Sequence, residues 1–84
     1  MNIEVRLYGT LRRYRPADAP GAPHAPFPVA LPSGASVSNL LTQLGIPDAF
    51  LSAAAVNDEA VETGYPLSDG DRVAMFPPSA GGRR

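Results

Sequence analysis

The residues best suited to chemistry lie at the C-terminal end of the chain, in the segment Phe76-Pro77-Pro78-Ser79-Ala80-Gly81-Gly82. Phe76 ends an apolar alternating run, and two prolines then remove two successive backbone donors, so sheet pairing should stop there. The five residues from Pro78 to Gly82 would span about 16–18 Å when extended. Because glycine has no Cβ, such a tail could enter a narrow channel and present the carbonyl of Gly82 to chemistry inside it. The alternative is an ordinary frayed terminus.

The rest of the chain has few side chains suited to catalysis or metal binding. The chain has no cysteine, which excludes disulfides, thiolate metal sites and a thiol nucleophile, and favours a reducing, cytoplasmic location. All seven basic residues are arginine, so there is no lysine amine for a Schiff base or to accept a modifier. The single histidine, His24, lies in a proline-rich stretch, and we expect no metal or catalytic role for it.

Length, charge and hydropathy restrict the class of protein further. A chain of 84 residues is long enough for one domain with one modest core. The formal net charge of −1 is unlike that of nucleic-acid-binding domains, so no nucleic acid is expected as a partner. No apolar run is long enough for a membrane span, and the alternation that begins at Asn2 argues against a signal peptide.

A sheet and one helix must position the tail. Alternation of apolar and polar residues predicts short strands at residues 2–8, 27–31, 53–56, 59–62 and 72–76. Pro28 confines the second of these to a sheet edge, and Asn57-Asp58 favours a hairpin turn between the third and fourth. Apolar residues at 37, 40, 41 and 44 predict a helix, with Ser36 as N-cap and Gly45 after its end. A short turn is expected from Asp48 to Leu51. Together these elements predict an α+β fold, a mixed sheet with one face packed on the helix.

Two further segments lack such periodicity. Half of the ten prolines fall between Pro16 and Pro28, which predicts an exposed loop with polyproline-like stretches inside the domain. The basic cluster at residues 11–15 is interpreted as a solvated strand end or turn, with a phosphate or partner contact as the alternative.

Strand parity places two aromatic residues on the uncovered face of the sheet. Ile3, Val5 and Leu7 should face the helix, so Tyr8 should face away from it, and by the same alternation so should Phe76. An apolar patch beside the tail is typical of a partner surface. The alternative is two unrelated surface aromatics, which are common.

These residues resemble the ubiquitin-like sulfur-carrier proteins of the MoaD/ThiS group, over nearly the whole chain. The resemblance rests mainly on Ala54-Ala55-Val56-Asn57, on residues 66–74 (Pro-Leu-Ser-Asp-Gly-Asp-Arg-Val-Ala) and on the Phe76–Gly82 ending, which is most similar to the small subunit of molybdopterin synthase. It implies a β-grasp domain over residues 1–78 and a flexible tail over residues 79–84.

The resemblance also implies a carrier role and no enzymatic activity of the chain's own. In the group, an E1-like adenylyltransferase uses ATP to activate the carboxylate of the second glycine, here Gly82 preceded by Gly81, which then becomes a thiocarboxylate. The large subunit of molybdopterin synthase would receive the sulfur, and no cofactor or metal would be bound. Tyr8, Phe76, Pro77, Pro78, Ser79 and Ala80 would contact the partners.

One departure from the group is the extension Arg83-Arg84. While Arg83 is attached, the Gly82 carbonyl belongs to an amide, so the hypothesis is that a protease removes both arginines. Two other readings stay open. The chain could carry sulfur for thiamine, cysteine or tRNA thiolation or act as a protein modifier, or it could be a β-grasp interaction domain whose tail is never activated.

Overall fold

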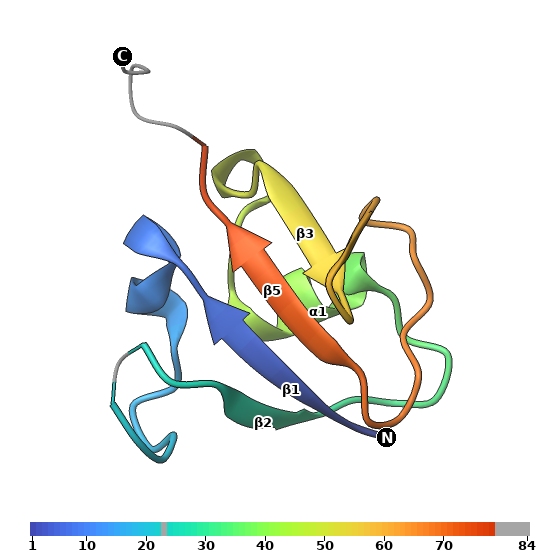
Figure 1. Ribbon diagram of the computed structural model, residues 1–84, viewed down its shortest axis with the longest axis horizontal. Coiled ribbons are helices and arrows are strands. Elements are labelled where there is room, and N and C mark those ends of the chain that lie inside the picture. The colour runs from blue at the N-terminus through green and yellow to red at the C-terminus, as the bar shows by residue number, and fades with distance from the viewer. Residues whose placement is uncertain (23, 79–84) are drawn as a thin grey trace.

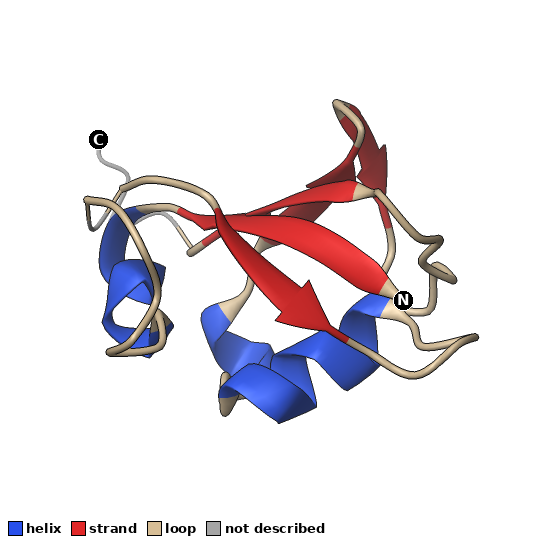
Figure 2. Ribbon diagram, turned by 90° about the horizontal axis from the view of Figure 1, so that it is seen from below, coloured by secondary structure: helices blue, strands red, loops and turns tan. Residues whose placement is uncertain are grey.

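The fold is a five-stranded mixed sheet with helices on one side, seen in a computed structural model that describes residues 1–22 and 24–78 (Figures 1 and 2). The strand order is β2-β1-β5-β3-β4. The strands are β1 (Asn2–Leu7), β2 (Phe27–Ala30), β3 (Ala53–Val56), β4 (Glu59–Val61) and β5 (Arg72–Phe76). One α-helix, α1 (Val37–Leu44), and two short 3₁₀ helices, η1 (Gly9–Tyr14) and η2 (Asp48–Phe50), complete the described elements. The predicted α+β class is confirmed, and η2 is the short turn expected after Pro47.

The core lies between the sheet and α1. Burial alternates along β1 and β5, with Ile3, Val5 and Leu7 facing inward together with Val73 and Met75. Leu40 and Leu41 of α1 are fully buried in the same cluster, and Leu44 is half-buried at its margin. Because β1 and β5 are the central strands and run parallel, their ends lie side by side (Figure 1).

Helix α1 begins and ends where its sequence predicts. The Asn39 amide N–H donates to the Ser36 hydroxyl at 3.3 Å, and the Ser36 amide donates to the Asn39 side-chain oxygen at 2.8 Å, which together form a capping box. Gly45 has φ of +76°, the left-handed conformation that ends many helices. These local interactions determine the length of the only α-helix among the described residues.

The Asp69-Gly70-Asp71 turn connects three parts of the fold. The Asp69 side chain accepts from the Asn2 amide at 2.7 Å. The Asp71 side chain accepts from the Ser68 amide at 2.8 Å and from the Asn57 side chain at 3.0 Å. The turn therefore holds the start of β1 and the β3–β4 hairpin around the beginning of β5. Its role in this structure is architectural, since it lies at the opposite end of β5 from Phe76.

One of the sequence-based interpretations is wrong. The basic cluster at residues 11–15 is neither a strand end nor a simple turn, because residues 9–14 form η1 and Leu11 is fully buried beneath it. The interpretation of the cluster rested on its charges and missed that Leu11 and the partly buried Tyr14 pack this helical turn against the core.

The described part of the proline-rich stretch is a mostly exposed loop, as predicted, and it contains tight turns. The Ala19 amide donates to the Pro16 carbonyl at 3.1 Å, and the Ala25 amide to the Ala22 carbonyl at 2.9 Å. The Arg15 guanidinium organises the loop from inside: it donates to the carbonyls of Ala19, Pro20 and Ala25 and lies over the ring of Phe27. The planar, many-donor guanidinium satisfies several carbonyls at once, which compact turns require.

Candidate functional site

The candidate site lies where β1 and β5 end, immediately before the tail. The parallel register closes with Leu7 opposite Met75, and the Tyr8 amide continues the ladder by donating to the Met75 carbonyl at 3.1 Å. On the other side of β5, the Ser52 amide donates to the Phe76 carbonyl at 2.8 Å. The backbone is therefore held on both sides up to Phe76, and the two prolines that follow carry no amide to extend the pairing.

Tyr8 and Phe76 form one aromatic surface on the uncovered face of the sheet. Their ring centroids are 4.7 Å apart with an interplanar angle of 12°, a stacked pair. Phe76 is 37% exposed and Tyr8 is half-buried. The parity argument from the sequence is confirmed: both rings lie on the face opposite α1. An exposed stacked pair offers a rigid apolar contact that costs a partner little side-chain ordering.

A third residue of this site, Gly9, was missed by the sequence-based reasoning. It has φ of +55°, and a Cβ placed on it would lie 2.9 Å from Cγ of Pro77. The chain thus turns sharply after Tyr8 and lets the Pro77 ring approach the backbone of Gly9. The available signal was a glycine directly after an alternating strand, but only the fold shows that Pro77 occupies the space.

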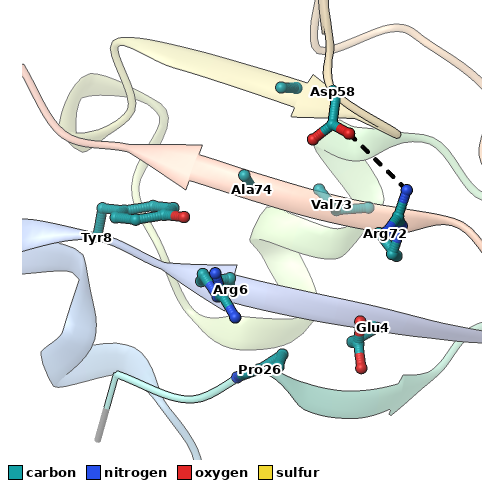
Figure 3. A pocket seen from close by; sticks show the side chains of 9 residues that line it. Glu4, Arg6, Tyr8, Pro26, Asp58, Arg72, Val73 and Ala74 are labelled. Atoms are coloured by element: carbon teal, nitrogen blue, oxygen red, sulfur yellow. Dashed lines mark ion pairs between the residues drawn. The ribbon is translucent and has the colours of Figure 1, made fainter.

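Beside the aromatic pair, small residues leave a hollow on the same face (Figure 3). The strand registers align Arg6, Ala74, Ala55 and Ala60 in one row across the sheet. Figure 3 shows Tyr8 at one end of the hollow and the ion pair of Arg72 and Asp58 at the other. That pair spans 3.8 Å between exposed side chains, so it adds little stability and remains available to a partner.

The remaining predicted site residues fall at or beyond the limit of the described chain. Pro77 is half-buried and Pro78 is exposed. The predicted residues Ser79, Ala80, Gly81 and Gly82 and the extension Arg83-Arg84 lie outside the described residues. His24 is exposed in the proline-rich loop.

Within residues 1–22 and 24–78 there is no group of three His, Cys, Asp or Glu side chains that could hold a metal ion. No helix in that part of the chain is long and apolar enough to cross a membrane.

Several solved structures share this fold. Small archaeal modifier protein 1 (SAMP1) from Haloferax volcanii is 22% identical, with a TM-score of 0.69 over 98% of this chain and 100% of the other. A molybdopterin converting factor subunit 1, described as putative, from Pyrococcus furiosus is 24% identical, with a TM-score of 0.66 over 94% and 99%. The complex of subunits 1 and 2 of molybdopterin-converting factor from Helicobacter pylori matches at 24% identity and a TM-score of 0.59, over 98% and 100%.

These similarities and the sheet topology define a β-grasp, ubiquitin-like fold, as the sequence resemblance predicted. The chain belongs to the ThiS family, whose model matches residues 22–82. No curated protein sequence matches the chain significantly. The family match includes the diglycine and stops before Arg83.

Proposed function

We propose that this chain is a sulfur carrier whose Gly82 becomes its last residue and is converted to a thiocarboxylate. A carboxylate oxygen of Gly82 attacks the α-phosphorus of ATP, pyrophosphate leaves, and an acyl adenylate forms. A sulfur nucleophile then attacks the acyl carbon and AMP leaves. A terminal carboxylate is ionised at neutral pH and can act as this nucleophile. An E1-like adenylating enzyme would bind ATP and supply the catalytic groups, so this chain is its protein substrate.

The observation that carries this proposal is the arrangement of the last described residues. The backbone is hydrogen-bonded up to the Phe76 carbonyl, the exposed Tyr8–Phe76 pair lies next to it, and two prolines then end the sheet pairing. A partner that binds the aromatic pair would find the diglycine a fixed number of residues further along the chain. The family match that ends at residue 82 supports the removal of Arg83 and Arg84.

For the receiving pathway we favour molybdopterin synthesis. The Phe-Pro-Pro-x-x-Gly-Gly ending supports this choice, as does the fold shared with subunit 1 of molybdopterin-converting factors, one of them solved in complex with subunit 2. The partner in this proposal is a large synthase subunit that accepts the tail. Sulfur transfer for thiamine, cysteine or tRNA thiolation uses the same activated glycine and differs only in the acceptor.

A second candidate is a protein modifier, because two of the similar structures are small archaeal modifier protein 1. Such a protein would form an amide with a lysine of its target. This chain has no lysine of its own, so it could not be extended into lysine-linked polymers. The third candidate is a β-grasp interaction domain that is never activated, and the attached Arg83-Arg84 is the feature that favours it.

One experiment separates activation from simple binding. Full-length protein and a form ending at Gly82 are each incubated with the adenylating enzyme of the same host and ATP, and the products are weighed by mass spectrometry. We expect an adenylate only from the Gly82 form. If neither form gives an adenylate, only the third candidate, an interaction domain that is never activated, would remain. Mass spectrometry of the protein from its host should show the Gly82 terminus, and finding only the full-length form would contradict the proposed processing.

A further inference from the structure

The two edges of the sheet are built differently. At the β2 edge, Pro28 has no amide N–H to offer, and the Gln43 side chain from α1 donates to the Ala30 carbonyl at 2.9 Å. Proline and covering contacts are common means of closing a sheet edge to other strands. The β2 edge is therefore protected.

The β4 edge has no such protection. Asn57 and Asp58 have φ of +52° and +73°, so they form a two-residue hairpin turn in which Val56 and Glu59 are the closing hydrogen-bonded pair. By the alternation of an antiparallel ladder, Ala55 and Ala60 are a non-bonded pair. The N–H and C=O of Ala60 consequently point away from the sheet, and no hydrogen bond from the described residues reaches them.

The same edge carries a distinctive set of side chains. Asp58, Glu59 and Glu62 place three exposed carboxylates within five residues, and only Asp58 has an ion-pair partner among the described residues. Next to them is a hollow lined by Glu59, Ala60, Val61, Glu62, Gly64 and Tyr65, with Tyr65 41% exposed. The edge thus combines open backbone groups, an apolar contact and negative charge.

We propose that the β4 edge binds an extended basic segment of a partner protein, which adds to the sheet as a strand beside β4. The partner backbone would pair with the N–H and C=O of Ala60, a recognition mode in which backbone bonds provide affinity and side chains provide selectivity. Arginine or lysine side chains would pair with Glu59 and Glu62, and an apolar side chain would contact Tyr65. This surface is distinct from the Tyr8–Phe76 site and needs no activation of Gly82.

Charge also argues against a second copy as the occupant. Pairing two β4 strands antiparallel about Ala60 places Asp58 of one copy opposite Glu62 of the other, and Glu59 opposite Val61. Like charges on neighbouring strands are destabilising, and inward or flanking charges on edge strands are known to prevent self-association. The carboxylates that select a basic partner therefore also keep the chain from pairing with itself.

The test uses full-length ¹⁵N-labelled protein without ATP and the peptide acetyl-TRVVRT-amide as the probe, whose two arginines are spaced to lie opposite Glu62 and Glu59 in an antiparallel strand. We expect saturable shifts in the amide resonances of β4 and slower hydrogen exchange at Ala60. Replacing both peptide arginines by glutamate should abolish binding. Equal binding of the acidic peptide, or shifts confined to other surfaces, would overturn the proposal. The proposal would also fail if the free protein sedimented as a dimer and charge reversal at Glu59 made it a monomer.

Three variants locate the contact. Ala60→Pro removes an outward N–H that the β3–β4 ladder does not use, so the fold should persist while peptide affinity falls about tenfold or more. Glu59→Gln and Glu62→Gln should each weaken binding by about two- to fivefold, with the effect lost at high salt. Asp18→Asn removes the same charge from the exposed loop and should have no effect. Unchanged affinity in both Ala60→Pro and the Glu59→Gln/Glu62→Gln double variant would contradict strand addition at β4.

Discussion

The ring of Pro77 occupies the space that a side chain on Gly9 would need, with its Cγ 2.9 Å from the position of a Cβ. The two residues are 68 positions apart and meet because β1 and β5 are parallel neighbours that end at the same level. Gly9 thereby sets how closely the start of the C-terminal segment packs against the domain.

Gly9→Ala should both destabilise the fold and disturb the site. A left-handed non-glycine residue costs about 1–2 kcal/mol, and the contact with Pro77 should add about 1–3 kcal/mol from overpacking. Gly34→Ala is the matched control, since Gly34 has φ of +87° and nothing within 4 Å of its Cβ position. Denaturant unfolding should show the larger loss for Gly9→Ala. If the Gly82 form is adenylated, only Gly9→Ala should slow that reaction, and equal effects of the two variants would contradict the packing argument.

The Tyr8–Phe76 pair should matter more for partner binding than for stability. A stacked pair contributes about 0.5–1.5 kcal/mol beyond burial, so Tyr8→Ala or Phe76→Ala should lower the free energy of unfolding only modestly. Binding to the adenylating enzyme should fall by about 30-fold or more if the pair is a binding hot spot of 2 kcal/mol. Calorimetric affinities for both single variants and the double variant give the coupling between the rings. Tyr8→Phe retains the stack and should bind normally; a loss as large as that of Tyr8→Ala would show that the hydroxyl is recognised instead.

Asn57 should contribute to stability through both its side chain and its backbone conformation. Its side chain accepts from the Arg72 amide and donates to Asp71, each at 3.0 Å, while its φ is +52°. Asn57→Gly removes the two hydrogen bonds but keeps the backbone free to adopt positive φ. Asn57→Ala removes the same hydrogen bonds and also disfavours positive φ, so it should lower the free energy of unfolding by about 1 kcal/mol more than Asn57→Gly does. Thermal unfolding of the two variants measures this difference, and an equal Tm would contradict a conformational role for Asn57.

Arg15 should determine the order of the proline-rich loop and leave the rest of the fold nearly unchanged. Lysine keeps the charge but lacks the planar fork that reaches the carbonyls of Ala19 and Ala25. We expect faster cleavage of Arg15→Lys within residues 16–26 by a protease of broad specificity, with less than about 1 kcal/mol lost in global stability. Arg13→Lys is the control, because the Arg13 side chain is exposed on η1, lies 5.9 Å from the Tyr14 ring centre and makes no hydrogen bond within the described chain. Identical cleavage of both variants would exclude this role for Arg15.

Features that depend on neighbouring residues could be predicted from the sequence. The spacing of apolar residues in 37–44, with Ser36 and Gly45 at its ends, predicted α1 to the residue, because caps and amphipathic periodicity act within a few positions. Asn57-Asp58 predicted the β3–β4 hairpin for the same reason. Strand alternation was also sufficient to place Tyr8 and Phe76 on the uncovered face.

The chain by itself determined α1, the five strands with their inward and outward faces, and the proline stop before the diglycine, since these follow from stereochemistry and short-range periodicity. Only the tertiary structure decided which distant residues meet: Gly9 with Pro77, Gln43 with Ala30, and Arg15 with the loop carbonyls. Such contacts depend on strand order and register, which place Tyr8 beside Phe76 and leave the β4 edge open. Strand order emerges from the packing of the whole core, and no local pattern in the sequence encodes it.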